Sequence, residues 1–178
     1  MNTAEKLAAT YLRLNGFLLL PHFTVFDGEH HNHIDLIGYR LANSKELVHG
    51  EELLRDTKLF EKLTEMIEMD SNASSIGIIV EVRSNENRDK ISDGHINYVR
   101  NFLGGIQLER ITFCCANTSF LCDQNGLRID LKHSFDWIQE RINWMEARKD
   151  HLSKMGSWTL SEEFLSDLLS LRRIDAAQ

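Results

Sequence analysis

The sequence predicts an α/β fold in which helices flank a central mixed β-sheet. Helical and strand-like segments alternate along the chain, and this order is typical of layered α/β domains. The segment 76–82 is an almost unbroken apolar run, which predicts a central strand buried on both faces. The length of 178 residues suits one domain with a helical appendage.

The expected elements begin with a helix over 3–14, because its apolar side chains recur at helical spacing. The strand-like segments 17–26 and 33–40 follow. A polar stretch with a turn dipeptide joins them, so a hairpin is expected. The remaining expected elements are a charged helix over 45–70, the strand 76–82, a helix over 89–103, a strand over 110–116, an edge strand over 127–131, a helix over 135–155 and an amphipathic helix over 160–173.

We expect the chain to divide into an α/β core over 1–133 and a C-terminal helical extension over 134–178 that packs on the core. A homodimer through the C-terminal helices is one expected assembly. The N-terminus lacks the basic stretch and apolar core of a secretory signal. No apolar run approaches the ~20 residues of a membrane span. A cytoplasmic protein without a membrane partner is therefore expected.

The charge and the cysteines exclude some classes of protein. A net charge of −7 argues against a general nucleic-acid coat protein, whose affinity comes from a basic surface. It does not exclude a nuclease, because a bound metal reverses the charge of its carboxylate ligands locally. The three cysteines have no CxxC pair and predict neither a zinc site nor a disulfide framework. Cys114 and Cys115 should point to opposite faces of a strand.

Acidic side chains occur on two neighbouring expected strands. Glu81 and Arg83 should point the same way because side chains alternate along a strand, and Val82 should point into the opposite layer. Asp35 sits mid-strand between two apolar residues, where a charged carboxylate is costly unless a partner or a metal compensates it. Two such carboxylates supply the oxygen ligands of a hard cation, which would polarise a phosphate and activate a water.

This order of residues resembles the PD-(D/E)XK, or restriction-endonuclease-like, superfamily. Its members have a helix bearing a glutamate, a hairpin ending in the motif aspartate, and a strand ending in Glu-x-Lys. The matching positions are Glu5, Asp35 and Glu81-Val82-Arg83. The resemblance implies a restriction-endonuclease-like core with extra C-terminal helices. It also implies that Asp35, Glu81 and the Val82 carbonyl bind Mg²⁺ or Mn²⁺, with Glu5 as an accessory catalytic group. A nucleic acid, DNA by family frequency, is the implied substrate.

The sequence departs from the family pattern at two positions. Ile34 stands where the motif name has proline, and Arg83 replaces the motif lysine. Arginine can clamp a phosphate with two parallel hydrogen bonds, but it stays protonated and cannot act as a base. Lys90 is a candidate for a relocated amine. His95 or Asn97 would be the assisting polar residue of the next helix.

Three hypotheses remain open. The first is a metal-dependent nuclease, or hydrolase, in which Arg83 stabilises the charge of the transition state. The second is a catalytically inactive protein of the same fold that serves as a binding or assembly subunit. Arg83, the acidic net charge and the C-terminal helices favour it. The third is an unrelated α/β protein in which Asp35 and Glu81 form structural ion pairs and Glu5 complements the helix dipole.

The histidine-rich segment 30–33 precedes Asp35 directly. We expect it to form a polar hairpin tip. The alternative is a transition-metal site in which His31 and His33 share a strand face with Asp35.

Overall fold

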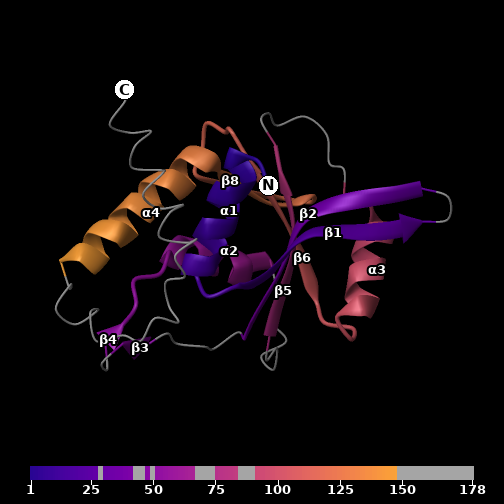
Figure 1. Cartoon of the computed structure of the whole chain (residues 1–178), viewed down its shortest axis with the longest axis horizontal. Helices are drawn as coiled ribbons and strands as arrows, with labels where there is room; N and C mark the ends of the chain where they lie inside the picture. Colours follow the sequence, from indigo (N-terminus) through magenta and orange to yellow (C-terminus); the bar gives the residue numbers. More distant parts are fainter. Residues whose placement is uncertain (28–29, 42–46, 49–50, 67–74, 84–90, 148–178) are drawn as a thin grey trace.

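The computed structural model describes residues 1–27, 30–41, 47–48, 51–66, 75–83 and 91–147 (Figure 1). Among these residues, no helix is long and apolar enough to cross a membrane. The elements are α1 (Thr3–Leu14), β1 (Leu18–Asp27), β2 (His30–Leu41), β3 (Leu47–Val48), β4 (Glu51–Glu52), α2 (Thr57–Met66), β5 (Ser75–Val82), α3 (Asp93–Phe102), β6 (Leu108–Cys114), β7 (Phe120–Asp123), β8 (Gly126–Asp130) and α4 (Leu131–Glu146).

Six strands form one mixed sheet in the order β1-β2-β5-β6-β8-β7. Strands β1, β2 and β5 are antiparallel neighbours, β6 and β8 run parallel to β5, and β7 returns antiparallel beside β8. The parallel step from β5 to β6 needs a crossover connection, which contains α3. The predicted α/β fold with a central mixed sheet is confirmed.

Helices cover both faces of this sheet (Figure 1). Helices α1, α2 and α4 pack on one face and α3 packs on the other. Strand β5 is buried from both sides: Ile78 and Val80 join the core beneath α1, and Ile79 joins the core beneath α3. Full burial of each such side chain contributes about 1.5–3 kcal/mol. The apolar run that predicted a central strand is explained by these two cores.

The helix expected over 45–70 is wrong in its first part. The chain forms the short β3–β4 ladder there, and α2 begins only at Thr57. Asp56 explains the start, because its Oδ1 accepts the N–H of Lys58 at 3.1 Å, as a helix-capping side chain does. Apolar residues keep a helical spacing on both sides of Asp56, so the spacing alone does not reveal where the helix starts.

The end of the sheet also differs from the expectation. The strand expected at the edge over 127–131 corresponds to β8, which lies one place inside the edge because β7 pairs outside it. Helix α4 begins at Leu131, four residues before the expected start, because Asp130 caps it by accepting the N–H of His133. The helix expected over 160–173 lies outside the described residues.

Helix α3 begins later than the expected position 89. Its first residue is Asp93, and Ser92 caps it by accepting the N–H of His95 at 3.3 Å. Strand β6 covers Leu108–Cys114, two residues before the expected bounds. Cys114 is buried and is the last residue of β6, whereas Cys115 follows the strand and is exposed.

The β7–β8 hairpin brings backbone close to backbone at Gly126. This residue has φ +116°, and a Cβ placed on it would lie 2.5 Å from the carbonyl oxygen of Arg110. Only glycine fits both the conformation and the space.

We predict that Gly126→Ala lowers the free energy of unfolding by about 2–4 kcal/mol, since strain and a backbone clash add together. The matched control is Gly94→Ala in the first turn of α3, where the new Cβ lies 3.5 Å from the Ser92 hydroxyl. It should stabilise the protein by up to about 1 kcal/mol, because alanine favours helix. Urea unfolding followed by circular dichroism measures both. Wild-type stability of the Gly126 variant would contradict the assigned contact.

Candidate functional site

The β1–β2 hairpin is regular except at one position. Its pairing keeps one register throughout but skips the pair that His22 and Asp35 would form. His22 has φ +54°, in the left-handed region that side chains with a Cβ adopt at a cost. Side-chain alternation slips at the same level: Ile34 joins the core beneath α3, whereas Leu36 joins the core beneath α1. We refer to His22 and Asp35 as the strand break.

Beyond the strand break, the outer half of the hairpin turns toward α3 (Figure 1). The ring of Phe23 lies 4.9 Å from that of Phe102 and 6.3 Å from that of Tyr98, measured between centroids. Strands β2 and β5 therefore part at this level. The last regular pair between them is Leu36 with Val80.

Asp35 closes the gap where these strands part. Its Oδ2 accepts the N–H of Val82 at 2.7 Å, in the position where a backbone carbonyl of β2 would otherwise serve. The N–H and the C=O of one strand residue face the same neighbouring strand, so the Val82 carbonyl also faces β2. The structure thus brings the Asp35 carboxylate and the backbone of Val82 together.

Glu81 and Arg83 project from the face of the sheet opposite to Val82. Val82 packs on the core beneath α1, so alternation directs its two neighbours toward the α3 side, as the sequence predicts. Glu81 is only 5% exposed, and a buried carboxylate is costly unless it is compensated. These side chains lie at the end of β5, directly beside the strand break.

The backbone of Arg83 has a hydrogen-bond partner on the neighbouring strand. Its N–H donates to the carbonyl of Phe113 at 2.8 Å, which extends the β5–β6 pairing by one residue. The Nε and Nη2 atoms of its guanidinium are buried and meet no hydrogen-bond acceptor within the part of the chain that the structure describes. A buried cation in that state strongly favours an anion beside it.

Glu5 belongs to the N-terminal cap of α1. Glu5 and Asn2 form a capping box in which each side chain accepts the other's backbone N–H, at 3.0 and 2.9 Å. The Glu5 Oε2 also lies 4.0 Å from Nε2 of His22. Glu5 therefore has a structural role at the helix start, and through His22 it reaches the strand break opposite Asp35.

The donor set at this place suits a hard cation. Asp35, Glu81 and the Val82 carbonyl offer only oxygen, which Mg²⁺ and Mn²⁺ prefer. Among the described residues, no group of three or more histidine, cysteine and acidic side chains could hold a metal. Two carboxylates and a carbonyl are a ligand set that Mg²⁺ accepts in proteins when they converge, because this ion keeps several waters and completes its shell with substrate oxygens.

Of the two polar candidates on α3, the structure brings His95 toward the hairpin. Its Nε2 lies 3.0 Å from the amide nitrogen of Asn32 on β2, and its Nδ1 accepts the N–H of Ser92 at 3.3 Å. Asn97 instead accepts a hydrogen bond from Arg100 on the exposed side of the helix, at 3.0 Å. His95 thus fixes the start of α3 against β2.

The other histidine and lysine candidates contribute less. Lys90 lies outside the described residues, as do the side chains of His30 and His31. His33 is exposed, and its Nδ1 lies 3.1 Å from the Thr24 hydroxyl on the neighbouring strand.

A polar groove of about 830 Å³ lies away from the strand break, between α3 and the β7–β8 turn. Its charged groups already have partners: Arg110 pairs with Asp93, and Gln107 donates to Glu109 at 2.9 Å. Burial raises the pKa of the Glu109 carboxyl group. The groove therefore lacks the unmatched charge that distinguishes the end of β5.

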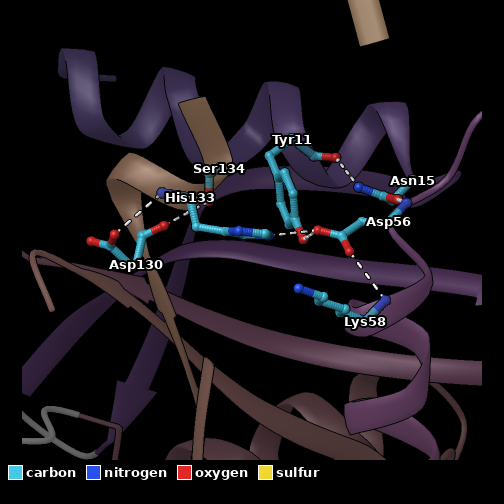
Figure 2. A network of polar contacts seen from close by, with 7 residues as sticks. All are labelled: Tyr11, Asn15, Asp56, Lys58, Asp130, His133 and Ser134. Atoms are coloured by element: carbon cyan, nitrogen blue, oxygen red, sulfur yellow. Dashed lines mark hydrogen bonds and ion pairs between the residues drawn. The ribbon is translucent and has the colours of Figure 1, made fainter. Parts of the chain in front are cut away.

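A second polar cluster, missed by the sequence reasoning, is buried between α1, the start of α2 and α4 (Figure 2). The Tyr11 hydroxyl donates to Oδ2 of Asp56 at 2.6 Å, and Nε2 of His133 lies 2.7 Å from the same oxygen. The side-chain oxygen of Asn15 accepts the N–H of Asp56 at 2.8 Å. The available sequence signal was an aspartate directly before a helix, the usual place of a capping residue.

Burial limits what this cluster can do. Asp56 is 4% exposed and Tyr11 is fully buried, so no substrate reaches them. Burial and the nearby carboxylate raise the pKa of Tyr11. Burial also opposes ionisation of Asp56, but the hydrogen bonds from His133 and Tyr11 outweigh it and hold the Asp56 pKa below its usual value. The carboxylate is therefore ionised, fully engaged and structural.

Comparison of the chain with protein-family models, with curated proteins and with solved structures finds no match. The interpretation of the site therefore rests on its own residues.

We predict that Asp56→Asn lowers the free energy of unfolding at neutral pH by about 1.5–3 kcal/mol, the range for hydrogen bonds to a charged group. The folded pKa of Asp56 lies below the unfolded one. Its contribution is therefore present above about pH 4 and is lost as the pH falls through the folded pKa.

Urea unfolding between pH 7 and pH 3 measures this effect. The variant should show a smaller loss of stability in acid than the wild type. The control is Asp136→Asn, which removes a solvent-exposed ion pair with Lys132 and should change stability by less than about 1 kcal/mol. Equal losses in the two variants would contradict the role of Asp56.

Proposed function

We propose that the chain is a metal-dependent nuclease with a restriction-endonuclease-like core, which hydrolyses phosphodiester bonds in nucleic acid, with DNA as the expected substrate. One juxtaposition carries this proposal. Where β2 and β5 part, the Asp35 carboxylate accepts the N–H of Val82, and the chain neighbours of Val82 are the buried Glu81 and Arg83. The Nε and Nη2 atoms of Arg83 meet no acceptor among the described residues.

The topology supports the same proposal. Helix α1, which carries Glu5, precedes the antiparallel hairpin that carries Asp35, and β5 ends in Glu81-Val82-Arg83. Helix α3 and the parallel strand β6 follow. This is the order of elements in the PD-(D/E)XK resemblance. Strands β7 and β8 and helix α4 would be additions to that core.

Asp35, Glu81 and the Val82 carbonyl would hold Mg²⁺ or Mn²⁺. When bound, such an ion polarises a phosphate and lowers the pKa of its bound water.

Arg83 binds the phosphate in this proposal. Its guanidinium fork matches two phosphate oxygens and opposes the charge that develops on them in the transition state. Burial strengthens this effect because a low dielectric screens charges less than water does. Since Arg83 stays protonated, it supplies charge and does not accept the proton of the attacking water.

The second candidate function is that of a catalytically inactive subunit of the same fold, which binds or assembles without cutting. Two observations favour it. The Asp35 carboxylate already accepts the N–H of Val82, and the Glu5 side chain already caps the start of α1. Both acids thus have a structural use that does not require a metal.

We predict that the wild-type chain cleaves plasmid or single-stranded DNA in Mg²⁺ or Mn²⁺. Asp35→Asn and Glu81→Gln should each slow cleavage by about 100-fold or more, comparable with loss of one transition-state contact. Asparagine still offers an oxygen to the Val82 N–H, so the fold should survive. Asp136→Asn, a distant exposed acid, is the control. Cleavage unaffected by either site variant would refute the nuclease proposal, and metal-dependent binding without cleavage would favour the inactive subunit.

We further predict that Arg83→Lys leaves cleavage unchanged or raises it, since a positive charge is retained and lysine is the family's residue. Arg83→Gln removes the charge and should slow cleavage by about 10²–10³-fold. Initial cleavage rates at saturating metal measure both variants. A collapse in the lysine variant would show that the planar guanidinium fork itself is required.

A further inference from the structure

The backbone of His22 is unusual for the middle of a long strand. Its φ of +54° interrupts β1, although Pro21 and Phe23 on either side pair regularly with β2. A residue with a Cβ adopts this conformation only where the surrounding structure requires it, and such strain often accompanies a functional site. The residue opposite His22 in the register is Asp35.

The irregular backbone of His22 coincides with an irregularity at Asp35. Because Ile34 and Leu36 pack on opposite faces of the sheet although they are two residues apart, the alternation of β2 slips by one at Asp35. In an unbroken hairpin, Asp35 would pair with His22 and its side chain would project from one face. Here Asp35 is out of the ladder, and its carboxylate reaches the N–H of Val82 at 2.7 Å.

The first turn of α1 lies near the strand break. The Nε2 of His22 lies 4.0 Å from Oε2 of Glu5, and the capping box with Asn2 holds Glu5 at 13% exposure. The His22 side chain is half exposed, so burial of its ring contributes little to the packing of the core. Its backbone conformation, rather than burial of its ring, is therefore the feature connected to Asp35.

We propose that His22 is a positioning residue for the candidate site: its left-handed backbone holds the strand break that sets the Asp35 carboxylate against Val82. The catalytic consequence rests on the proposed nuclease function, whereas the placement of Asp35 is a property of the fold. The substitutions that preserve the site should therefore be those that tolerate the left-handed conformation.

Three substitutions at this position separate backbone from side chain. His22→Asn and His22→Gly adopt the left-handed region readily, whereas the β-branched His22→Val does not. We expect the asparagine and glycine variants to cleave DNA within a few-fold of the wild-type rate. The valine variant should be about 100-fold slower, the effect of misplacing a reacting group by ~1 Å.

The control is Leu20→Val, which places the same β-branched residue in the same strand. Leu20 pairs regularly with Ile37, and its side chain is exposed, so this variant should behave as the wild type. Circular dichroism should show that every variant is folded.

Amide hydrogen exchange at Val82, followed by NMR, is a readout that does not depend on activity. The Val82 N–H should be protected in the wild type and in the asparagine and glycine variants, and should exchange faster in His22→Val. Equal protection in His22→Val would overturn the inference whatever the cleavage rates. If asparagine and glycine also abolish cleavage while Val82 stays protected, the imidazole itself is used and the backbone role is refuted. If Val82 exchange follows this prediction in all four proteins but the wild-type chain does not cleave DNA, the positioning role is supported and the nuclease proposal is refuted.

Discussion

The hydrogen bond from the Val82 N–H to the Asp35 carboxylate joins β2 to β5 at the level where their ladder has ended. Because a side chain replaces a backbone acceptor there, the two strands part without leaving this N–H unpaired. The outer half of the hairpin can then pack on α3, while β5 continues its pairing with β6 through Arg83. This contact places the Asp35 carboxylate against the backbone of the residue between Glu81 and Arg83.

The chain uses buried acids in two different ways. Asp56 has hydrogen-bond partners for both carboxylate oxygens and links three helices, so its charge stabilises the fold. The end of β5 has the opposite character, because the Arg83 guanidinium is buried with atoms that meet no acceptor among the described residues. A satisfied polar cluster stabilises a fold, whereas an unmatched buried charge favours a ligand of opposite sign. This contrast, more than the sequence motif, distinguishes the strand break from the Tyr11–Asp56–His133 cluster.

Structural and proposed catalytic roles overlap at the strand break. Glu5 caps α1 and lies near His22, and Asp35 serves both the sheet and the proposed metal site. Both acids therefore have structural uses in this fold, and the proposed catalytic roles would be additional to them. The Nε and Nη2 atoms of Arg83 meet no acceptor among the described residues, which is why the nuclease proposal gives this side chain the phosphate.

The sequence by itself determined the elements whose signals are local: the helix 3–14, the buried strand 76–82, and the shared direction of Glu81 and Arg83. These follow from side-chain periodicity, which one segment carries alone. Only the tertiary structure decided the slip at Asp35, the place of β7 outside β8, and the start of α2 at Asp56, whose partners Tyr11 and His133 are 45 and 77 positions away. Periodicity within a segment cannot encode such contacts, because they depend on which distant residues the fold brings together.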